Sequence, residues 1–537
     1  MVNGSSKLPA YCASLFVLSA IAMAAVNDPK VAEAAKDQDA AQLRVLLKQQ
    51  ADVNAPLADG ATALHWATYW DDASTVDLLI KAGAHVNASN DDGATPLYLA
   101  CVNRNAAIVE KLLAAGANPN AALPSGESAL MTAARTGSTE IVRVLLAHKA
   151  SVNAKENTHG QTALMWAIAY DHPDVTKALL DADAATSVRS EVRHRSVNTG
   201  FTISERKAGI VMNTDLGGFT PMLFAARSGN VETGKLLLAA GANVNDTAAS
   251  GAAALAIAAH SGNGPFAMFL LEHGADPNAA GAGYTPLHAA VLRGDRALVK
   301  ALLEHKADPN AELVKGTGTR YSSRDYHLNG AYVGATPYWL AAKYGEPEIM
   351  RLLVEHGADP KRVAKDGSNP LLAGINARNN TQLGQLFGRR DRTDTPTEFA
   401  ARPADEDERI TLAVATIACE LGDDPNAASK MGATPLSEAV SRGYESVVRL
   451  LIDHGANVNT PARGGLTPLH IAAQGGYDSI IRLLVAKGAA VDAKNARGMT
   501  PLAMTSLKVN DGYLGNIVPE AKLKAAAQVL VELGAKP

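Results

Sequence analysis

The stretch TPLHIAAQGGYDSIIRLLVAKGAAVDA, residues 467–493, carries the signals for two short helices joined by a turn. Thr467 suits the N-cap of a helix, and Pro468 suits the first helical position, because the N–H that proline lacks has no partner there. The small residues that follow allow a second helix to approach closely. The second apolar run is followed by Gly488, which suits the left-handed conformation that often ends a helix. The stretch therefore predicts a pair of short helices.

The same signals recur along the chain at a nearly constant spacing. Successive N-cap positions lie 32 to 34 residues apart, except for steps of 58, 51 and 65 residues, which we interpret as one unit plus an insertion. A fixed period of this length is typical of a stacked repeat architecture. The N-cap positions are Thr62, Thr95, Ser128, Thr162, Thr220, Ala253, Thr285, Thr336, Asn369, Thr434, Thr467 and Thr500.

The period and the sequence TPLHAA at residues 285–290 resemble the ankyrin repeat, whose unit of about 33 residues carries the pattern T-P-L-H-x-A. The resemblance covers roughly residues 28–537. It implies two antiparallel helices and a projecting finger per unit, and a stack that binds proteins with its fingers and the concave face of its first helices. We therefore expect an all-α fold, an ankyrin-repeat α-solenoid of about 12 helix-pair units with a degenerate N-terminal cap and finger-loop insertions. Intact T-P-L-H occurs only twice, so the inter-repeat hydrogen bonds that the family makes with this histidine are not expected in every unit.

The phase of the repeat divides the chain into units and insertions. The first two insertions interrupt the finger between units, whereas the third separates the two helices of one unit. The expected division is a signal peptide at 1–24, a capping repeat at 25–58, repeats at 59–184, a finger insertion at 185–213, repeats at 214–311, a finger insertion at 312–330, repeats at 331–379, an inter-helix insertion at 380–408, and repeats with a C-terminal cap at 409–537.

The insertions differ in the structure that their sequences predict. Alternating polar and apolar residues around the Asn-Thr-Gly at 198–200 predict an extended hairpin in the first insertion. The third insertion combines basic residues at 388–392 with the acidic run at 405–408, which predicts a solvated, flexible loop.

The N-terminal residues have the order of an export signal. Lys7 precedes an uncharged, mostly apolar run at 11–25, and the small residues Ala22 and Ala24 fit an A-x-A cleavage site. The run is short for a transmembrane helix, and the alternative is an uncleaved anchor or a frayed terminal helix. We expect cleavage near Ala24 and a location in a bacterial periplasm or outside the cell, with no stable membrane span.

Composition and motifs argue against several functional classes. The net charge of −4 gives no sign of attraction to nucleic acid. Cys101 and Cys419, the two cysteines after the signal, are too few for a disulfide scaffold. The stretch 229–236 matches most of a phosphate-binding loop, but Leu236 replaces the hydroxyl that would bind Mg²⁺. We therefore predict no catalytic residues, no cofactor and no enzyme activity.

Five histidines at equivalent helix ends raise the possibility of a metal site. Equivalent positions in neighbouring repeats lie about 8–10 Å apart, so metal–nitrogen bonds of about 2 Å cannot gather them at one ion. The simpler interpretation is interaction with the negative end of the helix dipole. The five are His148, His273, His305, His356 and His454.

Candidate partner-binding residues come from the repeat phase and from the insertions. The resemblance implies that the seventh and eighth residues after the N-cap face the partner, and aromatic and arginine side chains often anchor interfaces. For any single aromatic, packing against a neighbouring repeat is the alternative. The candidates are Tyr69, Trp70, Tyr170, Arg227, His260, Arg293, Arg320, Tyr321, Arg324, Tyr326, Lys343 and Tyr344.

The two finger insertions predict where the partner binds and what charge it carries. The first contains four arginines and the second contains two, which favour a protein partner with an acidic patch. Both emerge on the finger side, so we expect the partner on the concave face of residues 217–310. The predicted function is a non-catalytic scaffold for a protein partner. The alternative is a secreted effector that binds proteins of a foreign or host cell.

Overall fold

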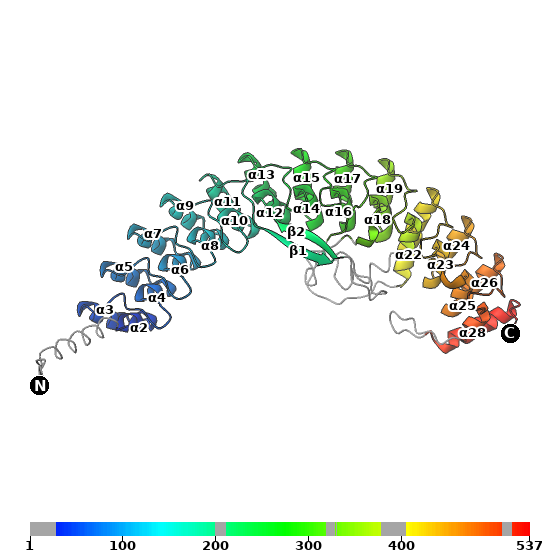
Figure 1. Ribbon diagram of the computed structural model, residues 1–537, viewed down its shortest axis with the longest axis horizontal. Helices are drawn as coiled ribbons and strands as arrows, with labels where there is room; N and C mark the ends of the chain where they lie inside the picture. Colours follow the sequence, from blue (N-terminus) through cyan, green and yellow to red (C-terminus); the bar gives the residue numbers. More distant parts are fainter. Residues whose placement is uncertain are drawn as a thin grey trace, which may run out of the picture. The chain divides into compact units, whose positions relative to one another are not determined.

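The computed structural model shows a mostly helical chain (Figure 1). It divides into two compact units. The first unit comprises residues 1–193 and 217–246, and the second comprises residues 194–216 and 247–537. Within the described residues the helices form twelve pairs behind one short N-terminal pair, which confirms the expected all-α ankyrin solenoid. The described residues are 28–198, 211–317, 328, 330–376, 404–506 and 518–536.

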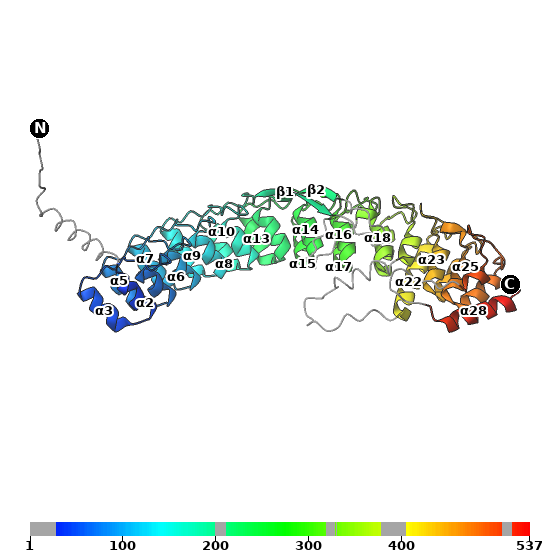
Figure 2. The ribbon, with the colours of Figure 1, turned by 60° about the horizontal axis from the view of Figure 1, so that its bottom comes forward.

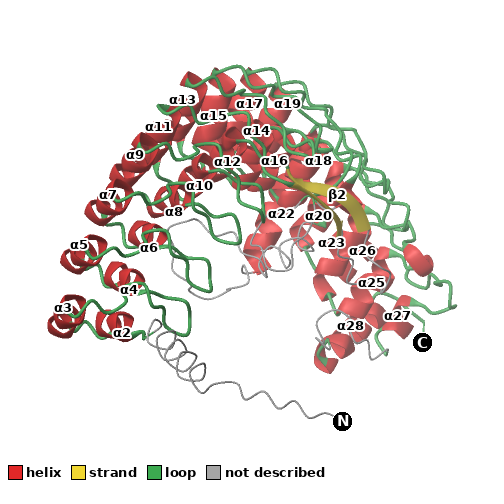
Figure 3. Ribbon diagram, turned by 60° about the vertical axis from the view of Figure 1, so that its left-hand side comes forward, coloured by secondary structure: helices red, strands yellow, loops and turns green. Residues whose placement is uncertain are grey.

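In the first unit, each repeat contributes a first helix and a second helix. First helices pack against first helices of neighbouring repeats, and second helices against second helices, so that two rows form (Figure 3). The first helices are α2 (Lys30–Lys36), α4 (Ala63–Tyr69), α6 (Pro96–Val102), α8 (Ala129–Thr136), α10 (Ala163–Ala169) and α12 (Pro221–Ser228). The second helices are α3 (Ala40–Lys48), α5 (Ala73–Lys81), α7 (Ala106–Ala114), α9 (Thr139–Ala147), α11 (Pro173–Leu180) and α13 (Val231–Ala239).

The second unit continues the same arrangement, and Figure 2 shows α14 paired with α15 and α16 with α17. Its first helices are α14 (Ala254–Ser261), α16 (Pro286–Arg293), α18 (Pro337–Tyr344), α20 (Pro370–Ile375), α23 (Pro435–Arg442), α25 (Pro468–Gly475) and α27 (Pro501–Met504). Its second helices are α15 (Gly264–Glu272), α17 (Arg296–Glu304), α19 (Pro347–Glu355), α22 (Ala404–Glu420), α24 (Glu445–Asp453), α26 (Asp478–Ala486) and α28 (Glu520–Glu532). Two 3₁₀ turns are η1 (Gly330–Tyr332) and η2 (Arg463–Gly465).

The core of each unit lies between its two rows of helices. In most repeats one leucine near the start of the first helix and one in the second helix are almost completely buried, and burial of each contributes about 1.5–3 kcal/mol. In the first unit these include Leu64, Leu97, Leu130, Leu164 and Leu223, and Leu79, Leu112, Leu145, Leu179 and Leu237.

The expected N-caps form, and three histidines extend them to the next repeat. His65 accepts a hydrogen bond from the backbone N–H of Thr62 through Nδ1, and its Nε2 donates to the carbonyl of Ala94, 2.9 Å away. His288 and His470 make the same contacts in the second unit. The histidine bridge therefore also occurs where the sequence reads T-A-L-H rather than T-P-L-H.

Helix ends adopt the left-handed conformation that the recurring glycines predict. Gly83 and Gly488 have φ angles of 87° and 92°. Lys149 and Lys306 replace glycine in two repeats yet keep φ angles of 66° and 68°. A side chain in this conformation costs roughly 1–2 kcal/mol, so the stack imposes a local strain at both lysines.

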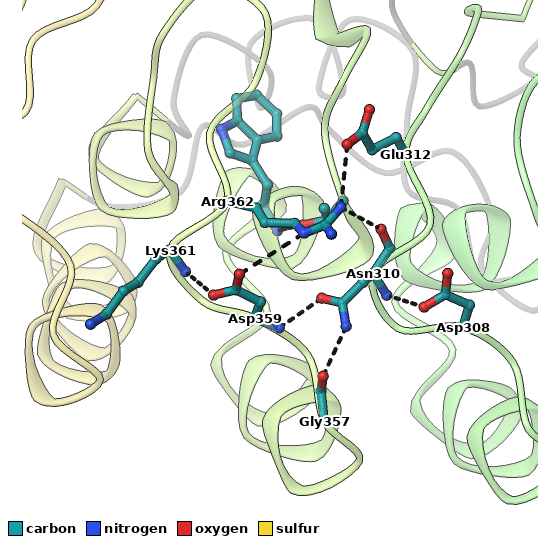
Figure 4. A network of polar contacts seen from close by, with 9 residues as sticks. Asp308, Asn310, Glu312, Gly357, Asp359, Lys361 and Arg362 are labelled. Atoms are coloured by element: carbon teal, nitrogen blue, oxygen red, sulfur yellow. Dashed lines mark hydrogen bonds and ion pairs between the residues drawn. The ribbon is translucent and has the colours of Figure 1, made fainter.

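A ladder of asparagine side chains connects the finger bases of successive repeats, and sequence reasoning missed it. Asn310 donates from Nδ2 to the carbonyl of Gly357 at 2.9 Å and accepts at Oδ1 from the N–H of Asp359 at 2.7 Å (Figure 4). The signal was an asparagine recurring at the repeat period. The ladder consists of Asn54, Asn87, Asn120, Asn153, Asn278, Asn310, Asn426 and Asn459.

The first insertion contains two paired strands, as predicted, but the second begins later in the chain than a turn at 198–200 implies. β1 (Val192–Asn198) and β2 (Val211–Gly217) pair as a two-stranded sheet, while most of the predicted turn lies outside the described residues. At the base of the insertion, the N–H of Ser190 donates to the carbonyl of Phe219, and the Phe219 N–H donates back to the Ser190 hydroxyl.

The acidic run at 405–408 does not lie in a loop, contrary to the prediction. It lies in the first turn of α22, where negative side chains are stabilised by the positive end of the helix dipole. Glu408 also accepts hydrogen bonds from the backbone N–H and the hydroxyl of Ser446, at 2.8 and 2.6 Å. Glu408 therefore serves helix packing, whereas Asp405 stays exposed to solvent.

Among the described residues, no helix combines the length and apolarity needed to cross a bilayer. The predicted cleavage site at Ala24 lies outside them.

Candidate functional site

The first unit exposes large aromatic side chains at the C-terminal ends of two first helices. Tyr69 ends α4 and is 53 % exposed, and Trp70 caps the same helix at 42 %. Tyr170 caps α10 and is 56 % exposed. Since an aromatic ring normally buries much of its area, three rings left in water mark a candidate interaction surface.

The aromatic residues of α4 form a cluster. Tyr69 makes edge-on contacts with Trp66 and Trp70, with ring centroids 5.7 and 5.0 Å apart. The indole N–H of Trp70 donates to the carbonyl of Lys36, 3.0 Å away, so this ring is partly held by its own repeat stack. The Lys36 ammonium lies 5.2 Å from the centre of the Trp66 ring. The cluster thus already accepts one cation on an aromatic face.

A similar arrangement surrounds α10. The Arg135 guanidinium lies 5.6 Å from the centre of the Trp166 ring, and its Nη2 donates to Glu127 at 3.0 Å. Glu127 belongs to the finger that precedes α8, whereas Arg135 lies near the end of α8. Tyr170 follows Trp166 by one helical turn. The finger base and the helix ends therefore lie on the same face of the first unit.

The exposed aromatic residues that cap α4 and α10 are each followed by an aspartate. Neither aspartate is among the binding candidates predicted from the sequence. Asp71 and Asp171 are exposed and have φ angles of 60° and 61°. Asp71 accepts from the side chain of Asn105 at 2.8 Å, and Asp171 accepts from that of Asn230 at 2.6 Å. The available signal was aspartate directly after an aromatic helix end, at a left-handed position that aspartate tolerates better than most residues.

Arg227 is the candidate on α12, and its side chain packs on aromatic rings. Its guanidinium lies 5.7 and 5.4 Å from the ring centres of Phe219 and Phe224. The side chain is exposed but rests on aromatic residues of its own repeat.

The described candidate residues of the second unit make more contacts with neighbouring repeats than Tyr69 and Tyr170 do. Arg293 donates from Nε to the carbonyl of His260, 2.6 Å away, and the His260 ring lies 6.0 Å from that of Tyr284. Both side chains are half-buried. The structure therefore gives them a role in joining adjacent first helices.

Lys343 is buried, with only 6 % of its surface exposed. Its ammonium donates to the carbonyl of Asn376 at 2.7 Å and lies 5.8 Å from the centre of the Tyr332 ring. Burial, together with the nearby positive charge of Arg442, lowers the pKa of Lys343 to about 7. Its neighbour Tyr344 is half-buried.

The remaining four candidates lie outside the described residues. They are Arg320, Tyr321, Arg324 and Tyr326.

Four of the five recurrent histidines interact with their own helix ends, in agreement with the simpler interpretation, whereas Nε2 of His148 lies 3.7 Å from the Glu110 carboxylate. Nδ1 donates to the carbonyl four residues earlier at 2.8 to 2.9 Å in His273, His305, His356 and His454. No cluster of three metal-ligating side chains occurs in the part of the chain that the structure describes.

Cys101 and Cys419, the two cysteines among the described residues, are free and buried. Burial raises the pKa of Cys101 to about 12 and that of Cys419 to about 11. Neither thiol is therefore suited to act as a nucleophile near neutral pH.

Comparisons with known proteins agree with this repeat architecture. The family described as "Ankyrin repeats (3 copies)" matches residues 31–123, 108–190, 222–312 and 406–508, and "Ankyrin repeat" matches residues 333–365. The chain is 36 % identical over 131 residues to the B-cell lymphoma 3 protein homolog of Mus musculus, covering 22 % of this chain and 29 % of that protein.

Two further relatives match shorter shares of their own lengths. Palmitoyltransferase AKR1 of Lachancea kluyveri is 31 % identical over 144 residues, covering 25 % of this chain and 19 % of that protein. Transient receptor potential cation channel subfamily V member 6 of Rattus norvegicus is 35 % identical over 177 residues, covering 31 % and 22 %. The chain thus matches less than a third of the length of each relative.

Proposed function

Because the chain belongs to the ankyrin-repeat family, we propose that it is a non-catalytic scaffold that binds a partner protein through the ends of its first helices and its fingers. The observation that carries this proposal is the exposure of Tyr69, Trp70 and Tyr170 at equivalent ends of first helices. Tyrosine and tryptophan are the residue types most enriched among energetically dominant interface residues.

The absence of catalysis is part of the proposal. The free thiols are buried, and the described residues contain no cluster that could hold a catalytic metal ion. One relative is named a palmitoyltransferase, but the match covers only 19 % of its length. The shared segment therefore gives no ground for transferring that activity.

The location and the partner's charge are further parts of the proposal. The order of Lys7, apolar run and small residues supports export to the periplasm or the outside of the cell. The alternative, a secreted effector acting on a foreign cell, has the same support. The predicted acidic patch on the partner rests on Arg320 and Arg324, together with the arginines of the first insertion. Of these, Arg189 donates to the carbonyl of Gly218 at 2.9 Å, so part of that basic charge is used within the first unit.

Affinity purification of the tagged full chain from its own envelope fraction, after cross-linking, tests the proposal. We expect one or a few proteins to be recovered in near-stoichiometric amounts, and loss of recovery when Tyr69 and Tyr170 are both replaced by alanine. Mass measurement of the N-terminus in the same preparation tests cleavage near Ala24. Recovery of the chain only from the cytosol with Met1 intact would contradict export, and recovery of no partner would contradict the scaffold role.

A further inference from the structure

The repeats that carry the exposed aromatic residues are acidic. Residues 28–193 contain 14 Lys and Arg against 20 Asp and Glu, a net charge of −6, whereas the whole chain has −4. The rest of the chain is therefore close to neutral, and the negative charge is concentrated in the first four repeats and the cap. A surface in this region attracts cationic partners and repels anionic ones.

Part of this negative charge lies beside the exposed rings. We call Tyr69, Trp70, Val102 and Tyr170 with Asp71 and Asp171 the aromatic face. In two repeats of this face, an exposed ring is followed directly by an exposed carboxylate held in a left-handed conformation. An aromatic face attracts a cation through its quadrupole, and a neighbouring carboxylate adds direct charge attraction.

The fingers on the same side add carboxylates. Asp59, Asp91 and Asp92 are exposed in the fingers of the first two repeats, and the Asp91 N–H donates to the Asp59 carbonyl at 3.0 Å, so the two fingers lie side by side. The contact between Glu127 and Arg135 shows that a finger base and a helix end share one face. Carboxylates therefore flank the rings from both directions.

Two cation–π contacts within the chain already occur beside this face. The Lys36 ammonium lies over Trp66 and the Arg135 guanidinium over Trp166, at 5.2 and 5.6 Å from the ring centres. In both clusters the next aromatic residue along the helix, Tyr69 or Tyr170, stays exposed. Each cluster thus has one ring that already carries a cation and another that is open to solvent.

We propose that the aromatic face binds a lysine- or arginine-bearing segment of the partner protein, with one cation over the exposed rings of α4 and another over Tyr170. This inference rests on the proposed scaffold function and names the chemistry of its partner. Asp71 and Asp171 lie next to these rings and pair with the bound cations. An acidic segment is disfavoured here because it would place like charges beside both carboxylates.

The repeat geometry also sets the spacing of the two cations. Three repeat steps separate α4 from α10, and at about 8–10 Å per step they span roughly 25–30 Å. An extended chain advances by about 3.3 Å per residue, so the two basic residues are expected about eight or nine positions apart.

Panning the full chain against a display library of random peptides about 15 residues long tests this inference, since such peptides span both clusters. We expect the enriched peptides to carry at least two lysines or arginines. Replacing both Tyr69 and Tyr170 with alanine should weaken their binding by about 30-fold or more, the equivalent of about 2 kcal/mol for a true anchor.

Two further variants separate charge from folding. Asp71→Asn with Asp171→Asn removes both charges but keeps the oxygen that accepts from Asn105 and Asn230, so the backbone is retained while binding of basic peptides should weaken and lose part of its salt dependence. Val45→Ser on α3, at a residue 46 % exposed, is the matched control and should leave binding unchanged. Circular dichroism monitors folding of every variant.

The outcomes distinguish this inference from the scaffold proposal. Enrichment of no basic peptides overturns the inference. Basic peptides whose binding is indifferent to the tyrosine and aspartate substitutions overturn it too, while protein binding elsewhere on the chain remains supported. Loss of all partner recovery in the envelope experiment would instead remove the scaffold proposal.

Discussion

Replacing Asn310 with alanine removes the two side-chain hydrogen bonds by which one finger base holds the next repeat. These bonds reach Gly357 and Asp359 across the second insertion, at 2.9 and 2.7 Å (Figure 4). The partners are 47 and 49 residues away in sequence, compared with 29 and 31 for the bonds of Asn459 in an uninterrupted pair of repeats. Asn310 therefore joins repeats that a longer stretch of chain separates.

The expected loss of stability follows from the environment of these bonds. A hydrogen bond typically contributes about 0.5–1.5 kcal/mol net, so two bonds give about 1–3 kcal/mol. Both bonds are exposed, and the backbone groups left behind can bind water, so no additional penalty for buried unpaired groups applies. In a solenoid, most of this energy belongs to the interface between neighbouring repeats.

Hydrogen exchange at amides of α17 and α19, combined with urea unfolding followed by circular dichroism, measures the effect. We expect Asn310→Ala to reduce protection in these helices by the equivalent of about 1–3 kcal/mol and to make urea unfolding less cooperative. Asn457→Ala is the matched control, because its side chain accepts only a local bond from the N–H of Asn459. Equal losses for both substitutions, or none for Asn310→Ala, would refute the role assigned to the ladder.

Other predictions follow from single residues. Lys149→Gly and Lys306→Gly should each raise the free energy of unfolding by about 1 kcal/mol, because glycine adopts the observed φ angles of 66° and 68° without strain; lower urea midpoints would contradict this. Burial lowers the pKa of His288 from 6.5 to about 4, so the unfolded chain takes up a proton at this residue before the folded chain does. The stability contribution is complete above about pH 6.5 and is lost as the pH falls towards 4, and His288→Gln should flatten this part of the pH profile of urea unfolding. Cys101 and Cys419 should react with a thiol reagent only in urea, and fast labelling of either residue in the native chain, located by peptide mapping, would contradict their burial.

Most of the helix pairs could be predicted from the sequence because their signals are local. A cap depends on residues within one turn of the helix end, and the histidine and asparagine bridges recur with the repeat itself. The prediction of a solvated loop at 405–408 was wrong because the deciding signal is not local. The composition of this acidic run is that of a solvated loop, but its place at the start of α22 and its contact with Ser446 depend on the following repeat.

The exposure of the candidate residues could not be predicted from their place in the repeat. Tyr69 and Lys343 both stand seven positions after an N-cap threonine, yet Tyr69 is 53 % exposed and Lys343 is 6 % exposed. The carbonyl of Asn376 at the end of α20 and the ring of Tyr332 before α18 cover the lysine. The repeat phase alone determined on which face Tyr69 and Lys343 lie, because the face of a residue depends only on its spacing from the N-cap along one helix. Whether the face is open was decided by tertiary structure, since the covering atoms come from residues more than ten positions away.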